Sequence, residues 1–388
     1  MDFVDKQYDD YNLENLKKLT VIIPTYNRNY YLSRCLWYLS HFPFGEIIVA
    51  DSSIDEKKII NQTVISTLNQ EGKGNIKYLQ FPPESEVYGG DIYKKWNNAI
   101  QQIETEYSVI CTDKEFLIPT TLSKCIDFLC NNPDYNIVDA VFYLIDREAK
   151  KQLTFSVWRP NQRSLPLNDP AHRILLSDTN LVHPLMAVHR SDIHKKIYQY
   201  LDTYNVQSLG FGEIFLELLD VIAGKYHHLT TDDYLYRDNT NLNKIRGIDP
   251  KESSYCRYPK IYSYPDSLYN AELINVKMGL KDLLTEKSNI SSDTAIELLN
   301  EFIPQYISHR TTNSEPLLLR YPALSLIWAL IPSFIKLKLR IYVSKIRSIP
   351  NEVILKQNKE MLVVSSVIQK TVDLYREDKV DIIYMTFP

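Results

Sequence analysis

The chain has 388 residues, 44% of them apolar and 24% charged, and a net charge of −4. That length allows two domains, and the composition is ordinary for a globular protein with a buried core. A slightly negative chain lacks the basic charge typical of nucleic-acid-binding proteins, so no nucleic-acid partner is expected.

The cysteine content and the N-terminal segment indicate the cellular compartment in which the protein is expected. The five cysteines lack paired spacing, so neither a disulfide framework nor structural zinc is expected. Residues 1–18 are acidic and have no apolar run, which favours an N-terminal extension over a secretory signal. No stretch reaches the roughly 18 uninterrupted apolar residues that a membrane-spanning helix needs. A cytoplasmic protein in a reducing compartment is therefore expected.

Strand-like and helix-like segments alternate over the first third of the chain. Short β-rich apolar runs are expected as strands, and runs with helical spacing of apolar residues are expected as helices. The strands are expected at 19–26, 46–53, 75–82 and 107–113, and the helices at 30–42, 56–70 and 89–104. This alternation predicts an α/β fold with a parallel sheet.

Polar residues follow three of these strands, at 25–28, 51–53 and 112–115. In an open sheet of parallel strands, ligands bind at the carboxyl ends of the strands. One polar strand end would carry little weight, but three in succession, each after an apolar run, predict a single site.

The same segments resemble glycosyltransferase family 2. The resemblance is carried by the runs VIIPTYNR, IIVADSS, NNAI and TDKEFLIP, which follow the family's order. It implies a Rossmann-like GT-A domain that binds a nucleotide sugar over residues 19–250, followed by a mainly helical region at 262–388.

The resemblance also assigns the nucleotide site. Pro24, Tyr26 and Arg28 would line it, and Asp51 would contact the base. The implied donor is a nucleotide-diphosphate sugar, with a UDP-sugar favoured.

The resemblance implies a metal site at the triplet of residues 113–115, Asp-Lys-Glu. Asp113 and Glu115 take the positions of the family's acidic motif, which holds the ribose and a divalent ion, Mn²⁺ or Mg²⁺, bridged to the diphosphate. Such an ion would neutralise the diphosphate and stabilise its departure. Lys114 stands where the family usually carries a third acid, so it either points to solvent or contacts phosphate directly and lessens the need for metal. A solvated turn without function is the remaining alternative.

The catalytic base is expected downstream, on a helix that ends at Gly224. By the resemblance, an acid opens this helix eleven residues earlier, which places Glu213 as general base after a flexible Gly210–Gly212 lead. Two alternatives stay open: Glu213 is only an acid favoured by the helix dipole, or Glu217 is the base.

A strand after Gly224 carries a candidate phosphate ligand. Arg237 is in register with the family's Tyr-Arg pair, and a guanidinium pairs well with phosphate oxygens. Asn239 falls where relatives carry a histidine. His227 and His228 precede this point on the expected strand and are interpreted as structural.

The C-terminal region has helical periodicity without a recognised catalytic motif. Within it, residues 323–347 combine an apolar run with five basic residues. This segment either lies at an anionic membrane surface or forms a core helix followed by a basic surface helix. Contact with the acceptor or a homo-oligomer is a further expectation for the region.

These features together predict an inverting glycosyltransferase that moves a sugar to a hydroxyl of a glycan or lipid-linked acceptor, in surface polysaccharide synthesis. A catalytically inactive GT-A-like module that binds glycan or a partner is the alternative. A nucleotidyltransferase would need a glycine-rich loop after the first strand, and residues 24–35 contain no glycine.

Overall fold

The computed structural model describes residues 12–83, 91–147, 153–157, 162–180, 184–238, 266–314 and 362–369. In these residues a nine-stranded sheet has the order β3-β2-β1-β4-β8-β6-β9-β5, with β7 paired to β6. The strands are β1 (Leu19–Thr25), β2 (Glu46–Asp51), β3 (Ile76–Gln80), β4 (Tyr107–Ile110), β5 (Glu115–Leu117), β6 (Tyr135–Arg147), β7 (Leu153–Val157), β8 (Val188–Arg190) and β9 (Lys225–Asp238).

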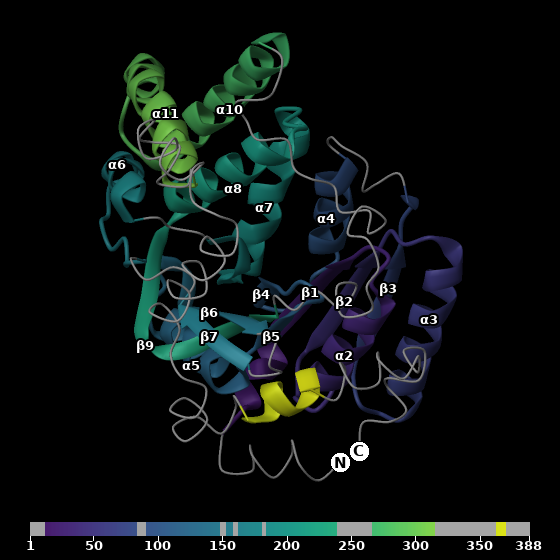
Figure 1. Ribbon diagram of the computed structural model, residues 1–388. Helices are drawn as coiled ribbons and strands as arrows, with labels where there is room; N and C mark the ends of the chain where they lie inside the picture. The colour runs from purple at the N-terminus through teal and green to yellow at the C-terminus, as the bar shows by residue number, and fades with distance from the viewer. Residues whose placement is uncertain are drawn as a thin grey trace, which may run out of the picture.

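Helices lie on both faces of this sheet (Figure 1). They are α2 (Asn29–Leu39), α3 (Asp55–Gln70), α4 (Asp91–Gln101), α5 (Pro119–Asn131), α6 (Pro170–Asn180), α7 (Ser191–Thr203), α8 (Leu209–Ala223), α10 (Asp266–Lys287) and α11 (Ser292–Ser314). Short 3-10 turns are η1 (Glu14–Lys18) and η3 (Pro184–Met186), and residues 362–369 form one more helix.

The first half of the sheet is parallel, as the sequence predicts. β1 lies between β2 and β4, and β3 flanks β2, all in the same direction. The second half is mixed: β8 is antiparallel to both β4 and β6, β9 runs parallel to β6, and β5 is antiparallel to β9. The predicted fold class, α/β with a helical C-terminal region, is confirmed.

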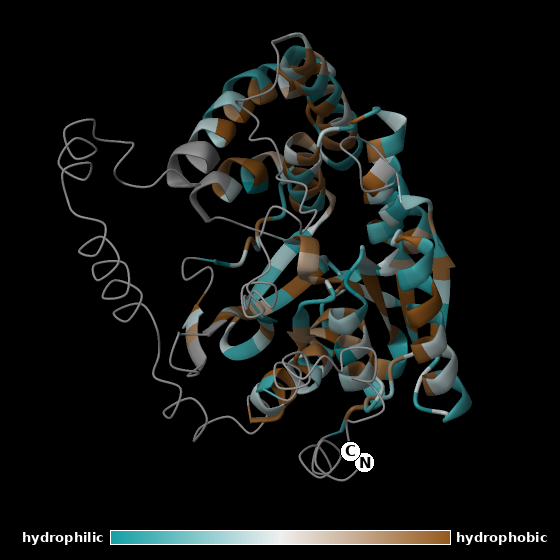
Figure 2. Ribbon diagram, turned by 45° about the vertical axis from the view of Figure 1, so that its right-hand side comes forward, coloured by the Kyte–Doolittle hydropathy of each residue, from teal (hydrophilic) through white to brown (hydrophobic). Residues whose placement is uncertain are grey.

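Alternating side chains of the parallel strands enter two separate cores. In β1, Val21 and Ile23 pack into the core formed with α2, α3, α5 and residues 362–369. Ile22 points to the opposite core, which contains α4, α6, α7, α8, α10 and α11. This two-residue period is that of a strand buried on both faces. In Figure 2 the helices around the sheet carry both hydrophobic (brown) and hydrophilic (teal) residues.

The C-terminal helices pack onto the α/β part. Val276, Leu280 and Leu284 of α10 enter the same core as α8, and α11 lies against α10 (Figure 1). The helical character expected after residue 262 is therefore confirmed where the structure describes it. The segment 323–347 lies outside the described residues, and the domain boundaries stay predictions. None of the described helices is both long and apolar enough to span a membrane.

Candidate active site

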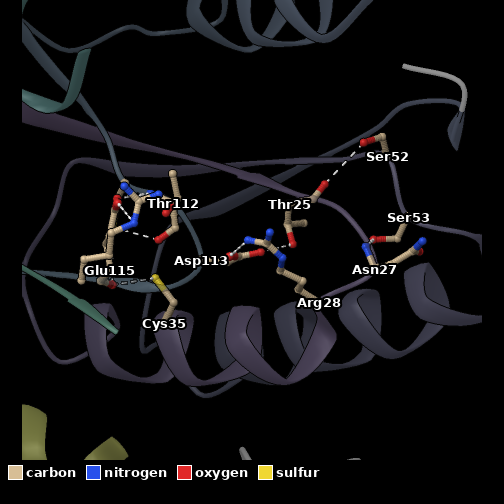
Figure 3. Close-up of polar contacts among 11 residues, drawn as sticks. Thr25, Asn27, Arg28, Cys35, Ser52, Ser53, Thr112, Asp113 and Glu115 are labelled. Carbon is tan, nitrogen blue, oxygen red and sulfur yellow. Dashed lines mark hydrogen bonds and ion pairs between the residues drawn. The ribbon is translucent and has the colours of Figure 1, made fainter. Parts of the chain in front are cut away.

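The turns after β1 and β2 are joined by Asn27. This residue has a φ of 55°, in the left-handed region that Asn tolerates better than most residues. Its backbone N–H donates to Ser53 Oγ at 2.8 Å, and its Oδ1 accepts from the Ile54 N–H at 3.0 Å. The turn delivers Arg28 to the start of α2, with its side chain toward the end of β4 (Figure 3).

Asp113 connects the ends of β1 and β4. Its Oδ2 accepts from Thr25 Oγ1 at 2.9 Å, and its Oδ1 accepts from Arg28 Nη1 at 3.0 Å. The side chain is 1% exposed, so this ion pair is buried on its acidic side. Pro24 is buried in β1, and Tyr26 is half-buried in the turn that follows. The structure thus brings together the strand-end residues predicted for the nucleotide site.

Asp51 ends β2 and is completely buried. Its Oδ1 accepts from the Ser53 N–H at 2.7 Å, and its Oδ2 accepts from Asn61 Nδ2 at 2.7 Å and from the Tyr78 hydroxyl at 2.6 Å. Burial, and then the bond to Asp51, raise the pKa of Tyr78, so the phenol stays a donor. Asp51 therefore lies at the same edge of the sheet as Asp113, with β1 between their two strands, but its carboxylate is held by groups of the protein itself.

Lys95 on α4 was not predicted from the sequence. Its side chain is 2% exposed, and its Nζ donates to Ser52 Oγ at 2.9 Å. Burial lowers its pKa to about 7, against the opposing effect of Asp51 and Asp113. A signal was available, because position 95 falls on the helical stripe of Ile92 and Ala99, where a lysine is out of place unless it is paired.

Lys114 does not point into solvent. The residue is half-buried, with its Nζ 4.8 Å from the centre of the Tyr31 ring. Burial and the neighbouring Arg28 lower its pKa to about 8, and Asp113 and Asp238 oppose that shift. The solvated-turn alternative for the triplet is therefore wrong, since all three of its side chains are at least partly buried.

Glu115 belongs to β5 and is directed away from Asp113. Its Oε2 accepts from the Thr112 N–H at 2.8 Å, and its Oε1 lies 3.5 Å from Arg237 Nε. The pairing of β5 with β9 sets Glu115 directly opposite Arg237. Burial raises the pKa of Glu115, and Arg237 opposes that shift. Figure 3 shows Asp113 and Glu115 turned to separate partners.

The partners of Asp113 and Glu115 decide whether these two residues fit the predicted metal site. Both oxygens of Asp113 already hold donors, one of them a guanidinium, and the Glu115 carboxylate is turned to Thr112 and Arg237. Within the described part of the chain, no three His, Cys, Asp or Glu side chains are grouped to hold a metal. Glu115 Oε1 accepts no hydrogen bond and has only the 3.5 Å ion pair with Arg237. One carboxylate with both oxygens bonded and a second one turned to other partners do not fit one divalent ion held between them.

The helix that carries Glu213 starts earlier than predicted. α8 begins at Leu209, and its N-terminus is capped by the Ser208 side chain, which accepts from the Phe211 N–H at 3.3 Å. Residues 210–212 are therefore helical, and the expected flexible lead is wrong. Glu213 is half-buried in the first turns of α8.

Two further acids of α8 are used in packing. Glu217 Oε2 accepts from the Tyr306 hydroxyl of α11 at 3.1 Å, and Asp220 Oδ1 lies 3.2 Å from His189 Nε2. Both acids are buried. Glu217, the alternative base, is thus turned toward the C-terminal helices.

The two histidines of β9 are structural, as interpreted from the sequence. The ring of His227 stacks on Phe128 with centroids 4.0 Å apart. His228 is buried with its Nδ1 2.7 Å from Asp139 Oδ1, in a network that also contains Tyr226. Asn239 lies outside the described residues.

The chain is similar to known proteins in sequence and in fold. Residues 20–197 match the family model described as glycosyl transferase family 2. Staphylococcus aureus TarS 1–349, solved with UDP-GlcNAc, is similar over 75% of this chain and 72% of its own, at 16% identity and a TM-score of 0.49. The mannosyltransferase PcManGT from Pyrobaculum calidifontis, solved with GDP-Man and Mn²⁺, is similar over 97% and 92%, at 12% identity and a TM-score of 0.37. No curated protein sequence matches significantly.

Proposed function

We propose that this chain, whose residues 20–197 belong to glycosyl transferase family 2, moves a sugar from a nucleotide-diphosphate donor to a hydroxyl with inversion. The observation that carries the proposal is the meeting of three strand ends. Arg28, Asp51 and Asp113 come from different segments and lie at the carboxyl edge of neighbouring parallel strands. That edge is where open α/β sheets bind nucleotides.

The donor would lie across these strand ends. Asp51 would contact the base, with Pro24 and Tyr26 beside the nucleoside and Arg28 toward the diphosphate. Arg237 would be a further phosphate contact, because its side chain is 32% exposed beside Glu115 and a guanidinium pairs well with phosphate oxygens. A UDP-sugar is the donor we favour.

Glu213 would act as general base. Its carboxylate takes the proton of the acceptor hydroxyl, and the oxygen forms a bond to the anomeric carbon of the sugar. The bond from that carbon to the diphosphate oxygen breaks, and its electron pair leaves with the diphosphate. One displacement of this kind inverts the anomeric configuration. The burial of Glu217 against Tyr306 supports Glu213 over its alternative.

Dependence on Mn²⁺ or Mg²⁺ at Asp113 and Glu115 stays a prediction, which the separate partners of the two carboxylates do not favour. The acceptor we propose is a growing surface glycan or a lipid-linked sugar.

Contact of residues 323–347 with an anionic membrane is also a proposal, and it concerns a segment outside the described residues. Deleting 323–388 is a poor test, because the helix at 362–369 packs Val363 and Val367 into the core. Replacing Lys336, Lys338 and Arg340 by glutamate is sharper. Loss of sedimentation with anionic vesicles would support the contact, and unchanged sedimentation would end it.

The function is tested by donor binding and turnover. Nucleotide sugars are screened by thermal shift, since a ligand that binds only the folded chain raises its melting temperature. The donor that stabilises the protein is then offered with candidate acceptors, and transfer is followed by release of the nucleoside diphosphate. If no nucleotide sugar raises the melting temperature, the proposal is refuted. Binding without transfer or donor hydrolysis would favour the inactive module.

A further inference from the structure

Three cations from three different elements gather around Asp113. Arg28 directly precedes α2, Lys95 lies on α4, and Lys114 lies in the turn between β4 and β5. Arg28 pairs with Asp113 directly at 3.0 Å, and the charges of both lysines interact with Asp113 and with Arg28. Segments far apart in the sequence therefore deliver positive charge to one place.

The acidic charge at this place is smaller than the basic charge. Asp113 interacts with all three cations, while Glu115 is turned to Thr112 and Arg237. Asp238 also interacts with Lys114, but its carboxylate is paired with buried Arg34 at 2.6 Å. Asp51 is the second acid whose charge interacts with Lys95. The oxygens of Asp51 already accept hydrogen bonds from Asn61, Tyr78 and the Ser53 N–H.

Gathering three positive charges at one place costs free energy, and a bound anion would offset that cost. Like charges repel one another, and burying an ammonium group removes its hydration. Lys95 is 2% exposed, so it experiences this loss almost fully. A diphosphate carries at least two negative charges and many acceptor oxygens, which match guanidinium and ammonium donors.

We propose that Arg28, Lys95 and Lys114 together bind the donor diphosphate and supply the positive charge that a divalent ion provides in metal-dependent enzymes. This inference rests on the proposed function, because it names what neutralises the leaving group of that reaction. The bond to the anomeric carbon breaks as before, and the negative charge that develops on the diphosphate oxygen is stabilised by the three cations. No metal ion takes part in the step.

The test is binding of UDP and of uridine by calorimetry, in EDTA and in Mn²⁺, because uridine has the base and ribose but no phosphate. In EDTA, wild type should bind UDP within about threefold of its affinity in Mn²⁺. Lys114→Met and Lys95→Met should each weaken UDP binding at least about tenfold and leave uridine binding within about twofold. Methionine keeps the unbranched shape and removes the charge, and at position 95 it suits the apolar stripe.

A matched control is Lys124→Met, because this exposed lysine of α5 pairs with Asp232 on the surface. It should bind UDP like wild type. UDP binding that is lost in EDTA and restored by Mn²⁺ in wild type would overturn the inference. So would unchanged UDP affinity in both folded lysine variants. If wild type binds UDP no more tightly than uridine, and GDP no more tightly than guanosine, the inference fails while the proposed function stands. If it binds none of the four, the proposed function fails with it.

Discussion

The ring of Tyr93 on α4 occupies the space where a side chain on Gly212 of α8 would begin. A Cβ at position 212 would lie 2.2 Å from Tyr93 Cε2, and the Tyr93 hydroxyl donates to the Leu209 carbonyl at 2.7 Å. This contact fastens the helix of Lys95 to the helix of Glu213. The group proposed to bind phosphate and the proposed base are thereby held at a fixed spacing.

Gly212→Ala should destabilise the protein although alanine is the better helix former. The gain in helix propensity is about 1 kcal/mol. It is opposed by overpacking of about 1–3 kcal/mol, because the added methyl group meets a buried ring. We expect a lower free energy of unfolding in urea and a fall in transfer rate, since the two helices must move apart.

The matched control places the same change in a Tyr93→Ala background. There the ring is gone, so Gly212→Ala should cost little or be stabilising, and the double-mutant cycle should show coupling between the two positions. Equal costs of Gly212→Ala in both backgrounds would mean that the contact does not limit the spacing of the helices.

Glu213→Gln should leave donor binding nearly intact and lower transfer by about 10²-fold or more, the scale for loss of a general base. The amide keeps the size of the side chain and removes its ability to accept a proton. The comparison is Glu217→Gln, which alters the bond to Tyr306 and should change stability more than the rate of transfer. Near wild-type transfer by Glu213→Gln would reject the assignment.

The parallel half of the sheet and its strand-end residues could be predicted because the relevant information is local. Short, nearly continuous apolar runs indicate the strands, and parallel neighbours share one carboxyl edge, so residues 25–28, 51–53 and 112–115 are expected to meet there.

Features that depend on distant pairing could not be predicted in this way. The direction of Glu115 is set by its register opposite Arg237 of β9. The early start of α8 is set by packing against Tyr93, which overrides the low helix propensity of Gly210 and Gly212. Lys95 was missed for the same reason, because its neighbour Ser52 belongs to another element.

Asp51→Ala should weaken nucleotide binding by about 1.5–3 kcal/mol, the range for hydrogen bonds to a charged group. A strand-end position alone suggests little effect on stability. However, Asp51 is fully buried, and its removal leaves the Ser53 N–H, Asn61 and Tyr78 without their acceptor. A loss of about 1–3 kcal/mol in the free energy of unfolding should therefore accompany the change.

Asn61→Ala separates these two effects. It removes one partner of Asp51 and leaves the carboxylate in place, so stability should fall and nucleotide affinity should change less than in Asp51→Ala. Nucleotide affinity that is unchanged in a folded Asp51→Ala protein would contradict the assignment of this residue to the base.

The metal hypothesis and the observed geometry assign Glu115 opposite roles. If it shares an ion with Asp113, Glu115→Gln should abolish Mn²⁺-dependent UDP binding. The geometry predicts instead that UDP affinity is unchanged with or without Mn²⁺, since the amide oxygen still accepts from the Thr112 N–H and only the contact with Arg237 weakens. Glu115→Ala, which leaves that partly buried N–H without the Glu115 acceptor, should lower the free energy of unfolding by about 1–3 kcal/mol. Calorimetry and urea unfolding of both variants distinguish the roles: a stable Glu115→Gln protein that loses Mn²⁺-dependent UDP binding would restore the metal site.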